Sequence, residues 1–472
     1  MKLYNSASRQ VEEFVPVKKG TVGMYTCGPT VYDYDHIGHG RKYTYDDLLR
    51  RIFLYQGYEV NHVQNITDVG HLVSDGDEGE DKLEKGSRKA GKTAFEVADF
   101  FTEAHFVSMD KLNILRPTTS SRATQHITEQ IELVSKLVEK GFGYDTPEAV
   151  YFDVTRFSRY ASLFGRQALE DKQTAVREEV HTGEHKRNPA DFALWFKRVG
   201  RFSDHQMHWD SPFGDGFPGW HIECSAMAMR YLGESFDIHT GGEDNLPVHH
   251  VNEIAQSEAA TGKPFAKYWL HYAFLTVDGA KMSKSLDNFY RVEDVEEKGY
   301  NPLALRYLYL TAHYRSPLNF TWSSLSSAQT AYDKLVEFVK IHKNKGEERT
   351  GLSKEKLKKI DQYRDRFLAA LGDDLAAPAA LAVMWEMLKS NIPDFDKLEL
   401  LLEWDQILGL DLANIGVEVV PEEIHKMGVD REVLRRDGKF VEADNLRMEL
   451  EKLGWAVLDT STGTRYKKLK GI

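Results

Sequence analysis

Four stretches of this 472-residue chain carry residues whose types and spacing could perform chemistry. The first holds Cys27, one of only two cysteines, nine residues before His36-Ile37-Gly38-His39. A buried apolar segment ends just before Cys27, and 42–58 has apolar residues at helical spacing. A strand, a tight loop and a helix in this order direct helix N-terminal amides at an anion, and two imidazoles there suit developing phosphate charge.

The second and third stretches hold further candidate metal ligands. Gly219-Trp220-His221-Ile222-Glu223-Cys224 contains the other cysteine, and His249 lies four residues before Glu253. Residues four apart on a helix share a face. Two thiolates, an imidazole and a carboxylate suit Zn²⁺, although the neighbouring His250 could replace His249. Each residue also has an ordinary explanation, since an isolated cysteine is commonly a buried apolar side chain.

The fourth stretch is Asp278-Gly279-Ala280-Lys281-Met282-Ser283-Lys284-Ser285. Two lysines and two serines beside a glycine form a flexible cationic loop that suits a triphosphate. Alone, it would be interpreted as a basic surface loop. Together with His36-Ile37-Gly38-His39 in its strand–loop–helix context, it matches the two signatures of class I aminoacyl-tRNA synthetases.

The elements that must position these residues follow an α/β pattern. Segment 59–66 predicts a second strand after the first helix, which makes a β–α–β unit and indicates a parallel sheet with helices on both faces. Ligands of such a sheet bind beyond the carboxyl ends of its strands, where Cys27, His36 and Thr67 would lie. The predicted fold class is therefore α/β, with a Rossmann-like, doubly wound parallel sheet.

The rest of the chain predicts an insertion and two later domains. Periodicity weakens across 144–200, which we interpret as part of an insertion, and the strand pattern resumes at 236–239 and 272–277. From about 325, four amphipathic segments with short breaks indicate a helical bundle. The last segment predicts one clear helix around 431–453 and short strands.

Composition describes a globular protein of a reducing compartment. Hydrophobic residues make up 41% and charged residues 28% of the chain, which is ordinary for such proteins. No apolar run approaches the roughly 20 residues that span a bilayer, and the first ten residues lack a signal-peptide pattern. Two cysteines exclude a disulfide framework. We expect a cytoplasmic protein that does not associate with membranes.

The net charge of −12 argues weakly against a nucleic-acid partner. A negative net charge of the whole chain does not exclude a local basic surface. The last twelve residues contain Arg465, Lys467, Lys468 and Lys470 and no acidic residue. This tail is either a phosphate-contacting strip or a solvated terminus.

Over nearly its whole length the chain resembles the cysteinyl-tRNA synthetase family. The resemblance is carried by Cys27-Gly28-Pro29-Thr30-Val31-Tyr32-Asp33, His36-Ile37-Gly38-His39, Asn65-Ile66-Thr67-Asp68, the 219–224 stretch, His249-His250-Val251-Asn252-Glu253, Lys281-Met282-Ser283-Lys284-Ser285, 436–447 and Gly463-Thr464-Arg465. Combining the pattern along the chain with this resemblance, we expect six parts. The catalytic domain would have its first half at 1–114 and its second half at 206–275, with a connective insertion at 115–205 between them. A stem-contact region with the lysine loop at 276–325, a tRNA-binding helical bundle at 326–415 and an anticodon-recognition domain at 416–472 would follow.

The resemblance also implies roles for individual residues. One zinc ion would be bound by Cys27, Cys224, His249 and Glu253 and would take the thiolate of the substrate. The amino-acid pocket would contain Gly28, Thr67, Trp220 and His239. The phosphates of ATP, accompanied by Mg²⁺, would be held by His36, Gly38, His39, Lys281 and Lys284.

The implied activity is ATP-dependent ligation of L-cysteine to the 3′ end of tRNA(Cys) through cysteinyl-adenylate, by a monomer. Serine differs from cysteine by one atom, and an apolar pocket separates such pairs by only ~1–3 kcal/mol. A soft metal ion binds thiolate far better than hydroxyl, so no editing domain is expected.

Two alternatives remain open at the level of sequence. A paralogous ligase that joins activated cysteine to an amino sugar in thiol-cofactor synthesis would share the zinc and both signatures, but would lack most of the chain after about 410. A nucleotide- and zinc-binding regulator without catalysis would be favoured by loss of a signature lysine or histidine, and none is lost.

Overall fold

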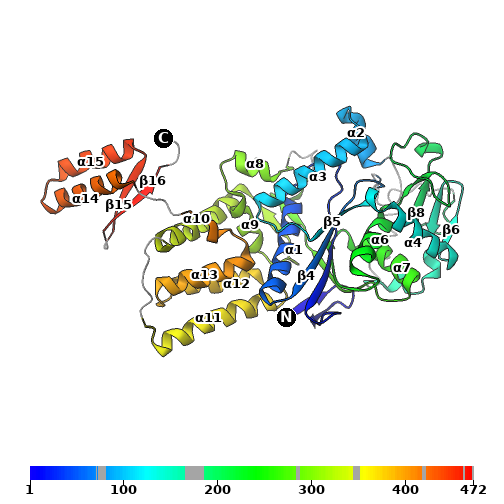
Figure 1. Cartoon of the computed structure of the whole chain (residues 1–472), viewed down its shortest axis with the longest axis horizontal. Helices are drawn as coiled ribbons and strands as arrows, with labels where there is room; N and C mark the ends of the chain where they lie inside the picture. The colour runs from blue at the N-terminus through cyan, green and yellow to red at the C-terminus, as the bar shows by residue number, and fades with distance from the viewer. Residues whose placement is uncertain are drawn as a thin grey trace. The chain divides into compact units, whose positions relative to one another are not determined.

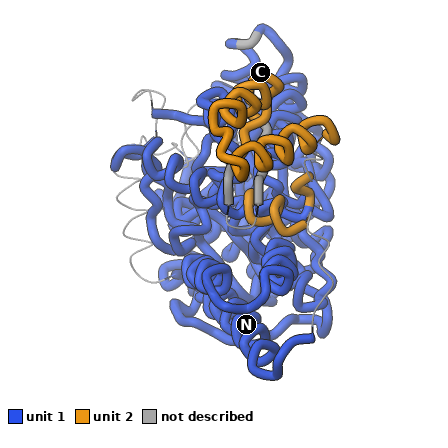
Figure 2. Tube along the Cα trace, turned by 90° about the vertical axis from the view of Figure 1, so that its left-hand side faces the viewer, with its two compact units in different colours: residues 1–335, 349–413 blue, residues 336–348, 414–472 orange. Residues whose placement is uncertain are grey.

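The computed structural model describes residues 1–70, 72, 81–164, 185–282, 288–343, 351–416, 421–460 and 463–469. The chain divides into two compact units, the first made of 1–335 with 349–413 and the second of 336–348 with 414–472 (Figure 2). In the described part, none of the helices has the length and apolar character needed to cross a membrane.

The first unit is built on a five-stranded sheet in which every pairing is parallel (Figure 1). The strands follow the order β11 (Ala266–Tyr272), β10 (Phe236–Gly242), β3 (Thr21–Thr26), β4 (Glu59–Ile66) and β5 (Thr119–Arg122). Helix α1 (Ile37–Tyr55) and helix α6 (Trp220–Leu232) lie on opposite sides of it. The doubly wound α/β fold predicted from the sequence is therefore confirmed.

The strand order reverses at β3, since β4 lies on one side of it and β10 on the other. Such a switch point opens a crevice outside the carboxyl ends of the strands, where ligands of open α/β sheets bind. Cys27 follows β3 directly, and its N–H donates to the carbonyl of Thr240 in β10 at 3.1 Å. Cys27 therefore lies at the switch point.

A separate four-stranded antiparallel sheet is formed by residues that lie, in the sequence, between strands β5 and β10 of the main sheet. It consists of β6 (Gly143–Asp145), β7 (Ala149–Phe152), β8 (Phe192–Lys197) and β9 (Gly216–Pro218). The main sheet continues past 115, because β5 still pairs with β4 in it. The small sheet extends beyond 205, as β9 pairs with β8.

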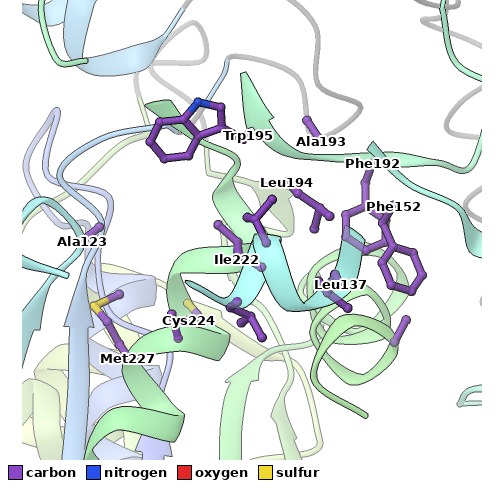
Figure 3. Close-up of a cluster of buried hydrophobic side chains, with 14 of the residues drawn as sticks. Ala123, Leu137, Phe152, Phe192, Ala193, Leu194, Trp195, Ile222, Cys224 and Met227 are labelled. Atoms are coloured by element: carbon purple, nitrogen blue, oxygen red, sulfur yellow. The ribbon is translucent and has the colours of Figure 1, made fainter. Parts of the chain in front are cut away.

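The small sheet packs against the helix that carries Cys224. Phe152, Phe192 and Leu194 from its strands form one buried cluster with Ile222 and Cys224 of α6 (Figure 3). The N–H of Gly219, the residue before α6, donates to the carbonyl of Leu194 at 3.1 Å. The inserted sheet therefore holds the start of α6 in place.

The predicted strand at 272–277 is also wrong, because it spans two strands of different sheets. Strand β11 ends at Tyr272, and β12 (Leu275–Val277) pairs with β13 (Ala280–Lys281) and β14 (Leu318–Phe320). Between them the N–H of Ala273 donates to the carbonyl of Tyr314 at 2.9 Å. The pairing of β11 with β10 runs only to Tyr272.

Helices dominate the remainder. The predicted bundle is present as α10 (Trp322–Lys343), α11 (Lys354–Gly372), α12 (Ala377–Lys389) and α13 (Asp394–Leu408). The single helix predicted around 431–453 is instead two, α14 (Glu422–Arg436) and α15 (Phe440–Lys452), broken at Gly438, which has φ +77. They are followed by the hairpin of β15 (Trp455–Thr460) and β16 (Gly463–Lys468).

Other helices complete the first unit. They are α2 (Lys82–Ala90), α3 (Ala94–Lys111), α4 (Ile127–Glu139), α7 (Val251–Thr261), α8 (Val292–Glu297) and α9 (Pro302–Leu310), with short strands β1 (Lys2–Asn5) and β2 (Gln10–Glu13) near the N-terminus.

Candidate active site

The N-terminus of α1 is capped by His36. Its Nδ1 accepts hydrogen bonds from the N–H groups of Gly38 at 3.1 Å and His39 at 3.2 Å. This atom can accept only when it carries no proton, and burial together with the charge of His39 lowers the pKa of His36 to about 3. A Cβ on Gly38 would lie 2.8 Å from His36 Cε1, so the cap requires glycine there. The neutral imidazole keeps Nε2–H as a donor beside the helix N-terminus.

The second signature histidine is placed differently. The His39 ring stacks on that of His36, with centroids 3.8 Å apart and planes 7° from parallel. Its side chain is 48% exposed, and its Nδ1 lies 3.0 Å from Asp35 Oδ1. One histidine therefore shapes the turn, while the other presents an imidazole paired with a carboxylate.

The described residues on either side of 283–287 lie close to the N-terminus of α1. The Ile37 N–H donates to the carbonyl of Tyr290 at 2.8 Å, and the ring of Phe289 lies 5.3 Å from that of His36. A Cβ built on Gly38 would lie 3.4 Å from Met282 Cε. Lys281 is exposed at the end of β13, whereas Lys284 lies outside the described residues.

Buried sulfur, nitrogen and oxygen donors converge at the switch point. Donor atoms within 4.8 Å of one another belong to Cys27, Cys224, His249 and Glu253. Tetrahedral zinc holds its ligand atoms about 3.2–3.8 Å apart, so a small inward movement of the side chains would complete a site. Two sulfurs, one nitrogen and one carboxylate oxygen fit zinc chemically.

Burial and mutual charge set the protonation states in this cluster. Burial acts to raise the pKa of Cys27, but hydrogen bonds with Cys224 and His249 lower it to about 5. Burial acts to lower the pKa of His249, but the Glu253 carboxylate, 2.9 Å away, and the Cys27 thiolate raise it to about 10. Binding of zinc would displace the proton on His249, because the metal binds neutral imidazole.

Both candidate histidines face the cluster. A second group, made of Cys27, His239, His250 and Glu253, also has its donor atoms within 4.8 Å of one another. His250 Nε2 lies 3.2 Å from the Cys27 sulfur. The group with His249 contains both thiols, and soft thiolate ligands suit zinc.

The two histidines are the last residues of a π-helical turn. Leu246–His250 forms this turn directly before α7 (Val251–Thr261), and single π-turns are frequent at functional sites. His249 nevertheless reaches Glu253 across the junction.

Two of the expected pocket residues, Trp220 and His239, contact members of the cluster. Trp220 stacks on His249 with ring centroids 4.2 Å apart. The N–H of Thr67 donates to the carbonyl of Pro29 at 3.0 Å, which ties the loop after Cys27 to the end of β4. His239 Nε2 lies 2.9 Å from Glu253 Oε2, so His239 contacts a candidate metal ligand.

Further histidines that the sequence did not single out support the ligands. His221 Nδ1 lies 2.9 Å from His249 Nδ1, and His250 Nδ1 lies 2.7 Å from His271 Nε2. Such partners orient an imidazole that binds a metal. His221 stands in the 219–224 stretch and could have been found there. His271 has no local signal, because the pairing of β10 with β11 brings it to the site.

Replacing Gly28 with alanine is expected to disrupt this site. The new Cβ would lie 1.6 Å from the carbonyl oxygen of Asn65, so the loop that carries Cys27 would have to move away from β4. We expect zinc affinity to fall about 10–100-fold, as when the support of a ligand is removed. Metal analysis after dialysis against a zinc buffer measures this. Gly372→Ala, where a Cβ meets open space, is the matched control, and undiminished zinc affinity in Gly28→Ala would contradict the expectation.

The family model and the similar proteins all belong to the aminoacyl-tRNA synthetases. The model of the class I tRNA synthetase (C) catalytic domain matches residues 13–330. The chain is 46% identical to cysteine–tRNA ligase 1 of Burkholderia lata, over 98% of this chain and 96% of that protein. It is 40% identical to the cysteine–tRNA ligase of Treponema denticola, over 99% and 100% of the two chains.

Among solved structures, the chain is similar to methionyl-tRNA synthetase of Mycobacterium tuberculosis in complex with methionyl-adenylate. The TM-score is 0.60 at 14% identity, and the match covers 84% of this chain and 93% of that one. At this identity the likeness shows the fold alone.

Proposed function

Because the chain belongs to the cysteine–tRNA ligase family of the class I aminoacyl-tRNA synthetases, we propose that it charges tRNA(Cys) in two steps. In the first step, the carboxylate of L-cysteine attacks the α-phosphorus of ATP, and pyrophosphate leaves with formation of cysteinyl-adenylate. In the second, a terminal ribose hydroxyl of the tRNA attacks the carbonyl carbon, and AMP leaves.

One observation carries this proposal: a single loop between β3 and α1 has Cys27 at its start and the two signature histidines at its end. At its start, Cys27 joins a buried cluster that fits a thiophilic metal. At its end, His36 and His39 flank the N-terminus of α1, which suits an anion. A loop with these two ends would hold cysteine and ATP against each other, so most of the rate gain would come from positioning.

The phosphates would be held by backbone amides and cations. His36 would donate through Nε2, and His39 would face the same oxygens beside it. Lys281 and Lys284 would bring positive charge to the phosphates as point charges. Mg²⁺ bound with ATP would neutralise part of the phosphate charge.

The amino acid would be selected at the cysteine cluster. When bound, zinc would supply a soft ligand position for the substrate thiolate that the hydroxyl of serine cannot match. Trp220 would cover this position, because its ring already stacks on His249. Gly28 and Thr67 would line the path from the cluster to the anion site, since both belong to the contact between the loop and β4.

We assign tRNA binding to the regions after the active site. The helical bundle of α10–α13 would contact the tRNA stem, and 416–472 would read the anticodon through aromatic and basic side chains. The relatives match across these regions as well, which favours tRNA over the amino-sugar acceptor of the alternative ligase.

Cysteine-dependent ATP–pyrophosphate exchange without tRNA tests the proposal. We expect exchange with cysteine to exceed exchange with serine by more than about a thousandfold, beyond the ~10–200-fold that pocket shape supplies. Charging of total tRNA with labelled cysteine then tests the second step. Comparable exchange with serine would reject selection by a metal, and charging without any exchange would reject a free-standing adenylation step.

A further inference from the structure

Asp35, directly before the signature turn, joins two imidazoles. Its Oδ1 lies 3.0 Å from Nδ1 of the half-exposed His39, and its Oδ2 accepts a hydrogen bond from His105 Nδ1. Asp35 is 9% exposed and His105 is 2% exposed. The carboxylate is therefore held by the protein interior on one side and contacts a solvent-facing signature residue on the other.

Among the described residues, the hydrogen bond of the His105 side chain is the one with Asp35. It lies in α3, seventy residues from Asp35, and its ring packs edge-on against Tyr43 of α1, with centroids 5.0 Å apart. Its Nε2 is buried and has no hydrogen-bond partner among the described residues. Within that part of the chain, the hydrogen bonding of this buried ring is directed at Asp35.

The negative charge of Asp35 acts on both signature histidines. Burial acts to raise its pKa, but the charge and hydrogen bond of His105 and the contact with His39 hold the pKa well below its usual range. His36 stays neutral because its Nδ1 is the helix cap. Of the two signature imidazoles, that of His39 contacts the Asp35 carboxylate at 3.0 Å, and the Asp35 charge also acts to raise the pKa of His36.

The same contact determines which nitrogen of His39 faces the ligand. Two groups lie near His39 Nδ1, the Asp35 carboxylate at 3.0 Å and the N–H of His36 at 3.3 Å. The carboxylate contact is shorter and charge-assisted, so Nδ1 carries a proton and donates to Asp35. Stacking on His36 limits rotation of the ring. Nε2 is then left for phosphate oxygens, to which it donates when the ring carries a proton on both nitrogens.

We propose that Asp35, held in place by His105, is a positioning residue that sets the orientation of His39 and holds a proton on its Nδ1 for the adenylation step. This inference rests on the proposed function. The arrangement matches the general case in which a carboxylate orients a functional imidazole through its other nitrogen. Its consequence is that Asp35 acts on catalysis only through His39.

A double-mutant cycle tests this dependence. Asp35→Asn is expected to lower kcat for cysteine-dependent pyrophosphate exchange about 10–100-fold, with KM for cysteine changed less than about twofold. In a His39→Asn background, the same substitution is expected to lower kcat less than about twofold, because the group it positions is gone. His105→Gln, which keeps an N–H donor for Asp35, is expected to retain more activity than His105→Leu.

The controls separate this role from general damage. Zinc content and thermal unfolding of each variant report on the fold, since the cysteine cluster is separate from Asp35. Asp110 lies on the same helix as His105 and forms an exposed ion pair with Arg116. The amide replacement Asp110→Asn is expected to leave exchange unchanged.

Three outcomes would decide against parts of the proposal. Unchanged kcat in Asp35→Asn would overturn the inference, as would an equal loss in the presence and absence of the His39 imidazole. Absence of exchange in the unmodified protein would instead reject the proposed function itself.

Discussion

Cys224→Ser is expected to remove the bound zinc and to lower cysteine-dependent exchange at least about a hundredfold. Cys224 is buried on α6 with its sulfur among the donors of Cys27, His249 and Glu253. A serine hydroxyl is nearly isosteric but is a hard, poorly ionised donor, so three ligands would remain and the metal would be lost. Metal analysis of the purified variant and exchange kinetics with cysteine measure the two effects.

The matched control for this change is Met227→Leu. Met227 is fully buried on the same helix, and it belongs to the same hydrophobic cluster as Cys224 (Figure 3). A volume-conserving replacement there disturbs packing by less than about 1.5 kcal/mol and removes no donor. If Cys224→Ser kept a full equivalent of zinc, the metal would be held by Cys27, His239, His250 and Glu253, and the ligand set proposed here would be wrong.

Deletion of 416–472 is expected to spare adenylation and to weaken charging. Every described residue assigned to cysteine or ATP lies in the first unit, and the deleted segment lies in the second. We expect pyrophosphate exchange to stay within about twofold of the full chain. Charging of tRNA(Cys) at limiting tRNA is expected to fall about a hundredfold, which corresponds to roughly 2.8 kcal/mol of lost tRNA binding. Parallel measurement of exchange and of kcat/KM for tRNA distinguishes the two steps.

A point substitution offers a second route to the same result. Trp455 is buried in a small core with Ile424, Leu450 and Val457, so Trp455→Ala removes the largest side chain that supports this part of the second unit. Large-to-small changes of this kind cost about 3–5 kcal/mol. Trp455→Ala should therefore reproduce the pattern of the deletion. Equal losses of exchange and charging in both variants would mean that 416–472 supports the fold of the whole chain rather than tRNA recognition.

The local part of the architecture could be predicted from the sequence because its causes are local. The strand–loop–helix around Cys27, the second strand at 59–66 and the four helices after about 325 follow from spacing along the chain. The inserted sheet was not recognised, since β7 and β8 are short and buried on both faces. Their continuous apolar runs show no alternation that would indicate strands.

By itself, the sequence determined the two signatures and the fold class, because caps, helix faces and strand–helix order depend on residues close together in the chain. It also supplied both cysteines and the spacing of His249 to Glu253. Only the tertiary structure placed Cys224 beside Cys27, His239 against Glu253, and His105 behind Asp35. Those contacts depend on strand pairing at the switch point and on helix packing across 70 residues or more, which no local pattern encodes.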